Sequence, residues 1–405
     1  KMKSDYGPKK LHYRMFGKGG GKKFNQLVIR AGFGYTWLHW LTSQQKQAMY
    51  TRDAWAKRMM AALGNLSVGT RYAHLFLNGM YWGVYNPTER IDGDFCELHL
   101  GGVAEDYDVV RFDDGKLNTV DGELGAYERM YELAKNSTDY SVYQSMLGLD
   151  VNGDSLENGE VLLNPANFCD FMLVNYYGGH GDWDHHNWVT VRSRVANEGY
   201  RWLPWDSELV LQGVNDNVTS VYNSKCPTAI FSKLMNNSQS FRMTLADRAY
   251  RALCEPFGML TPDSAQAVWE KLTAEIDDAM WAESARWGDY RRDVHQYTSR
   301  GELYTKTTHF DTQNDKMRTK YFPQRTDIVL AQLKTAGFWT DVEEAPKLRI
   351  GNEVLDVENA VIESTQYVSF KSSSTITYYT TDGSDPLAFT SAGKPKRGST
   401  STRYS

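Results

Sequence analysis

A helical period of apolar residues between positions 165 and 176 predicts the first clear element of this chain. Asn164 can cap the start of the helix, and Pro165 suits its first turn. Glycines directly after Tyr177 end the helical pattern, and a polar loop follows. The pattern then predicts two strands, over residues 188–192 and 200–205.

A hairpin over residues 73–85 is the clearest strand pair, because Asn78-Gly79 supplies its tight turn between apolar strands. Glu89-Arg90 follows this hairpin directly. This charged pair either faces a ligand or forms a solvated strand end, and the sequence alone favours the solvated end. The other predicted elements are strands over 26–30, 108–112 and 375–381 and helices over 52–63, 126–135, 261–287 and 326–336.

Composition is that of a soluble globular protein with two or three domains: 405 residues, 41% hydrophobic and 23% charged. The net charge of −5 gives no global basic field, so we expect no nucleic-acid partner. No apolar run is long enough to span a membrane, and no signal peptide is present, although the sequence starts and stops abruptly like a fragment. The cysteines form no C-x-x-C pair, which disfavours metal–thiolate sites and leaves the disulfide state open for Cys96, Cys169, Cys226 and Cys254.

Candidate chemistry is concentrated in the polar loop. His180, Asp182 and Asn187 have the spacing H-x-D-x-x-x-x-N, and Asp206 stands at the end of the second predicted strand. Phosphoryl transfer needs an aspartate that orients the attacking hydroxyl, and it needs an amide and a second aspartate that hold magnesium. Protein kinases meet this need with a catalytic loop of the same spacing. Because the pattern is loose and no D-F-G follows, a polar loop that satisfies its own backbone is the alternative.

Three other stretches imitate known sites. The Gly-rich residues 17–23 lack the register of a phosphate-binding loop and predict a surface hairpin. Residues 150–161 begin like a calcium loop but end on Val161 where a glutamate is needed, which favours an Asx-rich turn. Zinc is disfavoured at Asp184, His185 and His186, because adjacent histidines on a loop rarely point the same way. We expect these histidines to support the ligands or to face the substrate.

Several ordered motifs resemble the CotH (spore-coat protein H) kinase family: LNGMYWGVYNPTERID at 77–92, GDWDHHNW at 181–188 and RWLPWDSE at 201–208. The resemblance covers about residues 1–340 and looks like the longer bacterial members, which are typically exported. It implies an α+β, atypical protein-kinase-like fold with two lobes. It also implies ATP and Mg²⁺ or Mn²⁺ as cofactors, and serine or threonine of secreted or surface proteins as the acceptor.

The resemblance also assigns roles residue by residue. Asp182 falls at the aspartate that orients the substrate hydroxyl, and Asn187 and Asp206 fall at the metal ligands. Glu89 and Arg90 lie in the family's E-R motif at a strand end, where Glu89 would help to organise the nucleotide lobe.

Three positions depart from the family pattern. His180 stands where many relatives have asparagine, and Glu208 replaces a second aspartate. Arg111 stands near the position of a frequent lysine, and arginine is not equivalent to lysine in phosphate binding. The nucleotide-binding lysine is therefore not identified from the sequence.

The implied domains are a β-rich lobe over 1–120, a helical lobe with the catalytic loop over 121–345, and a partial β-sandwich over 346–405. The segment ITYYTTDGSDP at 376–386 looks like the chitobiase/β-hexosaminidase C-terminal module. Together these likenesses imply a secreted or cell-surface protein, with polysaccharide contact through the last module. Two alternatives stay open: transfer of AMP or glutamate on the same fold, and a catalytically weak surface or carbohydrate-binding protein.

Overall fold

The apolar segment after Asn164 forms a central helix, α6 (Pro165–Gly178), in the computed structural model. The structure describes residues 1–17, 20–136, 140–150, 155–295, 302–339, 347–355, 363, 365–371, 377–379 and 402–404. Asn164 caps α6 as predicted by accepting from the Asn167 N–H, and Gly179 ends it with a φ of 60°. Every residue of α6 except Ala166 is buried, so the helix is a core element and not the one-faced helix that the pattern suggested.

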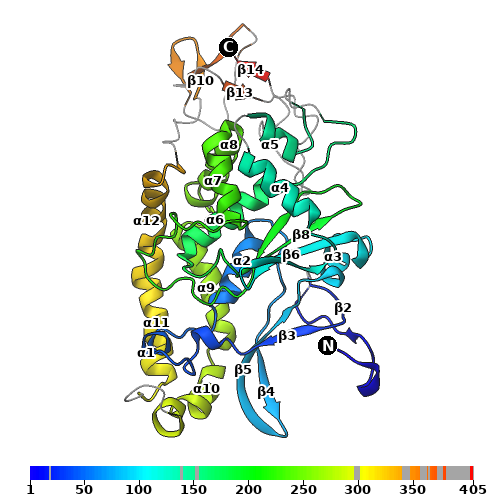
Figure 1. Ribbon diagram of the computed structural model, residues 1–405. Helices are drawn as coiled ribbons and strands as arrows, with labels where there is room; N and C mark the ends of the chain where they lie inside the picture. Colours follow the sequence, from blue (N-terminus) through cyan, green and yellow to red (C-terminus); the bar gives the residue numbers. More distant parts are fainter. Residues whose placement is uncertain are drawn as a thin grey trace.

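Two antiparallel sheets pack beside the helices (Figure 1), which confirms the predicted α+β class. The first sheet has the order β3-β5-β4, with β3 (Leu27–Arg30), β4 (Ala73–Leu77) and β5 (Met80–Glu89). Asn78 and Gly79 have φ values of 51° and 80°, which are the left-handed conformations that the predicted hairpin turn requires.

The second sheet has the order β7-β6-β8-β9, with β6 (Tyr107–Asp113), β7 (Lys116–Asp121), β8 (Trp188–Ser193) and β9 (Arg201–Pro204). The predicted strand pair 188–192 and 200–205 forms β8 and β9. β6 belongs to the β-rich lobe expected over 1–120, and β8 and β9 belong to the helical lobe expected over 121–345. The two expected lobes therefore share this sheet.

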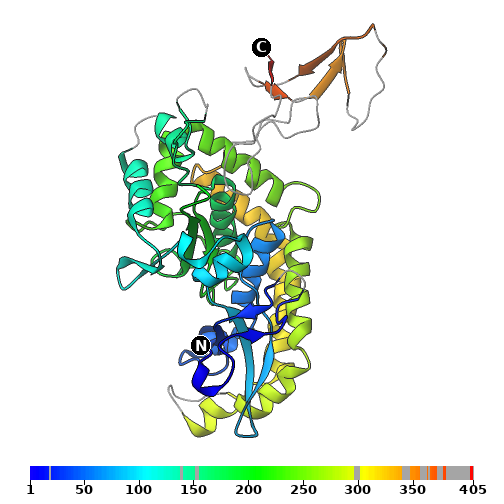
Figure 2. The ribbon, with the colours of Figure 1, turned by 90° about the vertical axis from the view of Figure 1, so that its right-hand side faces the viewer.

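Most of the helices lie to one side of the β3-β5-β4 sheet, and the β4–β5 hairpin projects from the molecule (Figures 1 and 2). The segment predicted as one helix over 261–287 is divided at Asp277–Asp278 into α9 and α10. The helices besides α6 are α1 (Thr42–Lys46), α2 (Arg52–Ala62), α3 (Gly93–Leu100), α4 (Gly125–Asn136), α5 (Tyr140–Met146), α7 (Pro227–Asn237), α8 (Gln239–Leu253), α9 (Pro262–Ile276), α10 (Ala279–Trp287), α11 (Asp311–Lys316) and α12 (Phe322–Thr335). Within the described residues, no helix combines the length and the apolar character that crossing a bilayer requires.

Short strands lie at both ends of the chain. β1 (Leu11–His12) pairs with β2 (Lys23–Phe24) around the Gly-rich stretch, as the predicted hairpin requires. At the other end, β10 (Lys347–Ile350) pairs with β11 (Glu353–Val354) and β12 (Val368–Lys371), and β13 (Thr377–Tyr379) pairs with β14 (Thr402–Tyr404). The end of the chitobiase-like segment, 380–386, and the start of the calcium-like stretch, 151–154, lie outside the described residues. The likeness of this end to a chitobiase module stays a prediction.

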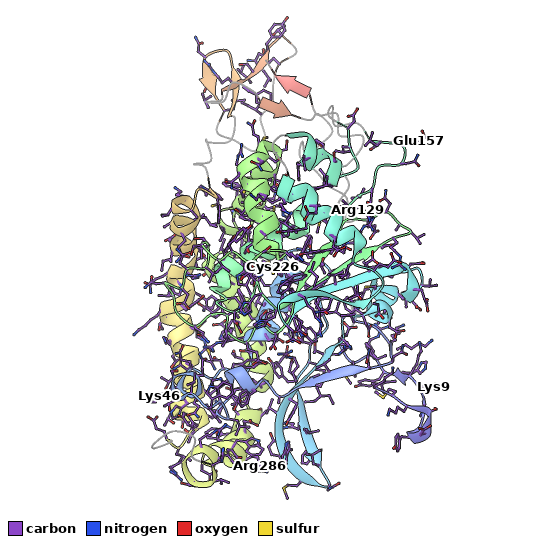
Figure 3. All side chains as sticks on the ribbon, viewed as in Figure 1. Lys9, Lys46, Arg129, Glu157, Cys226 and Arg286 are labelled. Carbon is purple, nitrogen blue, oxygen red and sulfur yellow. The ribbon has the colours of Figure 1, made fainter. Side chains whose placement is uncertain are left out.

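All four cysteines are free thiols, which settles the question that the sequence left open. Cys96, Cys169 and Cys226 are buried, and Cys254 is exposed. Cys226 lies in the interior of the molecule at the start of α7, whereas Lys9 and Lys46 lie at its periphery (Figure 3).

Candidate active site

The polar loop between α6 and β8 is folded into a compact turn by its own hydrogen bonds. The Asn187 N–H donates to the Trp183 carbonyl at 2.8 Å, and Asn187 Nδ2 donates to the Asp182 carbonyl at 2.6 Å. The Trp188 indole N–H donates to the Asp184 carbonyl at 2.7 Å. The loop backbone is therefore fixed before any ligand binds.

Asp206 joins this loop through the β8–β9 hairpin. Trp188 lies opposite Pro204, and the Trp205 N–H donates to the Asn187 carbonyl at 3.3 Å. Asp206 is the next residue, so its backbone lies close to that of Asn187 at one end of the hairpin, and Asn187 in turn bonds to the Asp182 backbone. Asp206 has a φ of 54°, a left-handed conformation that costs about 1–3 kcal/mol for a residue other than glycine and is concentrated at functional sites.

A buried ionic cluster that sequence reasoning missed lies directly behind Asp206. Arg30, the last residue of β3, forms ion pairs with Asp206 and, at 2.8 Å, with Glu208. Its Nε lies 3.4 Å from Asp53 Oδ2. Lys57 Nζ lies 2.6 Å from the same oxygen, one turn further along α2. Asp53 and Lys57 are fully buried.

Opposite charges keep the Asp53 carboxylate of this cluster ionised. Burial alone would raise the pKa of Asp53, but Lys57 and Arg30 outweigh burial and lower it to about 2. Burial lowers the pKa of Lys57, and the Asp53 carboxylate opposes this shift. Burial and the neighbouring Asp206 raise the pKa of Glu208 to about 7, although Arg30 acts in the opposite direction. The cluster therefore places one arginine and one lysine beside the proposed metal ligands.

Trp205 forms one wall of this cluster. The Arg30 guanidinium lies 5.5 Å and the Lys57 ammonium 5.1 Å from the centre of a Trp205 ring, within the range of a cation–π contact. The residue that precedes Asp206 thus helps to hold both cations in place.

Asp184 and His180 point into the protein. Asp184 accepts from the Thr228 N–H at 3.0 Å and from Asn223 Nδ2 at 2.9 Å, and it also binds the Thr228 hydroxyl. Burial raises its pKa to about 6 against these hydrogen bonds. Burial lowers the pKa of His180 to about 3, so its ring is neutral. Within the described residues, neither ring nitrogen of His180 has a hydrogen-bond partner. Asp184 thus anchors the loop to the start of α7.

His185 and His186 point outward together, which corrects the expectation that they diverge. His185 Nε2 lies 3.4 Å from Asp182 Oδ1, and His186 Nε2 lies 3.2 Å from Asp182 Oδ2. The two rings are 4.0 Å apart. The turn brings the side chains three and four residues after Asp182, those of His185 and His186, next to the Asp182 side chain. The two histidines therefore group with Asp182 and not with Asp184.

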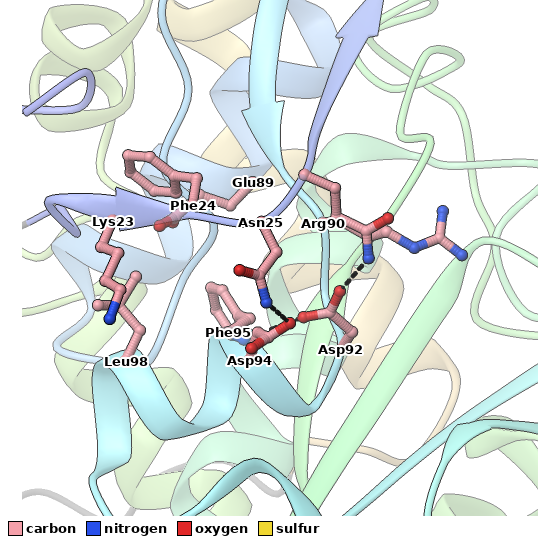
Figure 4. Close-up of a pocket in the computed structure, with 10 residues that line it drawn as sticks. Lys23, Phe24, Asn25, Glu89, Arg90, Asp92, Asp94, Phe95 and Leu98 are labelled. Carbon is pink, nitrogen blue, oxygen red and sulfur yellow. Dashed lines mark hydrogen bonds between the residues drawn. The ribbon is translucent and has the colours of Figure 1, made fainter. Parts of the chain in front are cut away.

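Glu89 is buried, so the solvated strand end that the sequence favoured is wrong for this residue. It accepts from the Gly69 N–H at 2.8 Å and contacts His99 Nε2 at 3.0 Å. Arg90, the next residue, is exposed. Both line a small pocket of about 20 Å³ between β2 and α3 (Figure 4), which has room for about one water molecule.

A larger pocket of about 430 Å³ opens beside Lys57 and Glu89. This volume lies within the range of small-molecule sites. Its lining combines apolar side chains with glycines and a few polar groups: Phe16, Gly20, Lys57, Arg58, Ala61, Asn65, Leu66, Ser67, Val68, Gly69, Thr70, Glu89 and His99. Because Lys57 also belongs to the ionic cluster, this pocket and Asp206 are connected through Lys57, Asp53 and Arg30.

Arg111 lies on β6 opposite Val189, the second residue of β8. Residues opposite one another in an antiparallel pair share a face of the sheet, so Arg111 lies on the same face as Val189. Its side chain is 42% exposed and pairs with Asp113 at 2.8 Å.

The family of the chain follows from a comparison with known proteins. Residues 30–329, well over half of the chain, match the family model described as CotH kinase protein. No curated protein sequence matches. A similar solved structure is that of the Helicobacter pylori proinflammatory kinase CtkA, with 14% identity and a TM-score of 0.25, over 72% of this chain and 86% of that chain. This low structural similarity adds no argument to the family match.

Proposed function

The chain belongs to the CotH kinase family, and on this premise we propose that it transfers the terminal phosphoryl group of ATP to serine or threonine of other proteins. Asn187 and Asp206 hold Mg²⁺ or Mn²⁺ in this proposal, and Asp182 orients the acceptor hydroxyl. Following the family resemblance, we further propose that the acceptors are secreted or surface proteins and that this protein shares their location.

The donor set at the end of the β8–β9 hairpin suits a hard dication. Asn187 uses its side-chain nitrogen on the Asp182 carbonyl, which leaves its Oδ1 for a cation. Asp206 adds a carboxylate that is 45% exposed. Mg²⁺ is commonly held by one or two carboxylates together with waters and substrate phosphates. When bound, such an ion neutralises the charge on the transferring phosphoryl group.

Arg30 and Lys57 supply the positive charge that a triphosphate needs. The pocket of about 430 Å³ borders Lys57 and has an apolar lining that includes Phe16, Leu66 and Val68, which suits a nucleobase. We assign the base to this pocket and the phosphates to the side that faces Arg30 and Asp206. Lys57 is then the best candidate for the nucleotide lysine.

Asp182 is placed to receive an acceptor from solvent. Its side chain is 39% exposed, and its backbone is tied to Asn187. An acceptor hydroxyl that reaches Asp182 therefore lies beside the proposed metal ligands. One observation supports this proposal: the backbones of Asn187 and Asp206 lie together at one hairpin end, where Asp206 pairs with Arg30 of the ionic cluster.

Intact-mass analysis after incubation with ATP and Mg²⁺ or Mn²⁺ tests the proposal. We expect a gain of one or more phosphoryl groups on the chain or on an added protein acceptor, and we expect a chelator to abolish the gain. Asp206→Asn should reduce the rate on the order of 10³-fold or more, because it removes a ligand of the ion that stabilises the transition state.

Asp315→Asn is the matched control, since Asp315 is 73% exposed and pairs only at the surface with Arg318. Equal rates in the parent and Asp206→Asn would contradict the assigned role of Asp206. A mass gain of AMP in place of phosphate, or of glutamate when glutamate is added with the ATP, would contradict the proposed reaction.

A further inference from the structure

The outward side of the catalytic loop carries a constellation of its own, formed by Asp182, His185 and His186. Their ligand atoms all lie within 4.8 Å of one another. The two histidines approach different oxygens of the Asp182 carboxylate, at 3.4 and 3.2 Å.

The two separations between histidine and Asp182 are close to those of ligands around one small ion. Zn²⁺ takes bonds of about 2.0–2.1 Å to nitrogen and oxygen in a tetrahedron. Neighbouring ligand atoms in such a tetrahedron are therefore about 3.3–3.4 Å apart. The contact at 3.4 Å between His185 and Asp182 is also longer than the usual N–H···O hydrogen bond.

The inward side of the same loop holds these three residues in place. Trp183 is fully buried, and Asp184 is bound by Thr228 and Asn223. Asn187 closes the turn from behind. A site whose ligands are oriented by such supporting contacts loses less entropy when it binds an ion.

The chemistry of the donors selects the class of ion. Imidazole nitrogens suit zinc, copper, nickel and iron, whereas Mg²⁺ prefers oxygen ligands. The Asp182, His185 and His186 side chains are 39%, 48% and 36% exposed, so an ion can enter from solvent and keep water in its fourth position.

We propose that Asp182, His185 and His186 form a binding site for a zinc-class transition-metal ion, separate from the magnesium ligands Asn187 and Asp206. Binding at this site does not depend on the proposed kinase reaction. One consequence does: an ion on Asp182 occupies the carboxylate that orients the acceptor hydroxyl, so Zn²⁺ inhibits phosphoryl transfer.

Calorimetric titration of metal-free protein with Zn²⁺ alone, without nucleotide, tests the site. We expect one ion per chain, with affinity that excess Mg²⁺ does not abolish. His185→Asn and His186→Asn should each weaken binding by about 100-fold or more, since each removes one of three protein ligands. His12→Asn, an exposed histidine on β1, should bind like the parent.

Titration with Co²⁺ provides a second measurement, because tetrahedral nitrogen and oxygen ligands give the ion a visible absorption band. The band should appear in the parent and in His12→Asn and should be lost in both loop variants, with thermal unfolding checking that each variant is folded. Absence of Zn²⁺ binding, or binding that both loop variants retain, would overturn the site.

The two proposals can fail separately. Zn²⁺ binding that requires both histidines but leaves phosphoryl transfer intact supports the metal site and removes Asp182 from the proposed reaction. Phosphoryl transfer that depends on Asp206, in a protein that binds no Zn²⁺, supports the kinase reaction and overturns the metal site.

Discussion

Asp53 and Glu283 are both buried carboxylates, and their surroundings act on them in opposite ways. Asp53 lies in the ionic cluster behind Asp206, and Glu283 lies where α10 packs against β5; they are 0% and 3% exposed. Burial raises the pKa of Glu283 to about 7. Around Asp53 the same burial is outweighed by Lys57 and Arg30, and the pKa falls to about 2.

The difference shows what each region is built for. Glu283 accepts the Val84 N–H at 2.8 Å, a contact that holds a helix to a strand and that a neutral acid also makes. The Asp53 carboxylate instead stays ionised inside the protein, which is costly unless its charge is compensated. Such a cluster has a use where phosphates and a metal ion must be held, which is the role proposed for its neighbours.

The largest effect is expected from breaking the charge balance around Asp53. Asp53→Asn leaves Lys57 facing a neutral amide and takes one partner from Arg30, so the free energy of unfolding should fall by about 3–5 kcal/mol. The pKa of Asp53 in the folded protein lies below its ordinary value of 3.8. Its contribution is therefore complete above that value and is lost as the pH falls towards 2.

Urea unfolding at neutral and at acidic pH measures both features. Asp277→Asn is the control, because Asp277 is 49% exposed in its pair with Lys306. This substitution should lower the free energy of unfolding by less than about 1 kcal/mol. A loss in Asp53→Asn as small as that of the control would show that the cluster adds no stability.

The contrast between these regions was not accessible from the sequence, although much of the loop was. The turn residues Asp182 and Asn187 are five positions apart, so their spacing could be read directly. Arg30 meets Asp206 across 176 positions, and no local pattern encodes such a contact. Asp53 and Lys57 stand four apart on a helix, which in a sequence looks the same as a surface pair.

Local patterns failed in the same way where tertiary packing decides the outcome. Neither glycine nor proline marks the break between α9 and α10 at Asp277–Asp278, so the sequence predicted one helix. The joint orientation of His185 and His186 depends on a turn that is anchored from inside by Asp184. The hairpin at Asn78-Gly79 was predictable because its two residues alone determine the turn.

A smaller effect, of opposite sign, is expected at Glu283. Its pKa in the folded protein lies above the ordinary 4.5, so the folded state binds the proton more tightly than the unfolded state does. Stability should therefore fall as the pH rises from about 4.5 to about 7. Glu283→Gln mimics the protonated acid and should remove about 2–3 kcal/mol of this pH dependence.

Unfolding of the parent and of Glu283→Gln across that pH range gives the comparison, with Glu270→Gln as the control because Glu270 is 43% exposed. Parallel pH profiles for the parent and Glu283→Gln would mean that Glu283 titrates at its ordinary pKa. The contrast with Asp53 would then be lost.

The smallest effect is expected at another buried carboxylate, Asp184. It sharpens the comparison because its partners are neutral donors, a hydroxyl and amides, and not cations. Its pKa of about 6 lies between those of Asp53 and Glu283. Thr228→Val keeps the shape of the side chain and the backbone N–H bond to Asp184 but removes the hydroxyl donor. The free energy of unfolding should therefore fall by about 1–2 kcal/mol. The difference between parent and variant should widen as the pH rises through about 6, since a charged carboxylate gains more from a donor than a neutral one.

Thr335→Val on the exposed side of α12 is the matched control. If Thr228→Val lowers the free energy of unfolding equally below and above that pH, Asp184 stays in one protonation state.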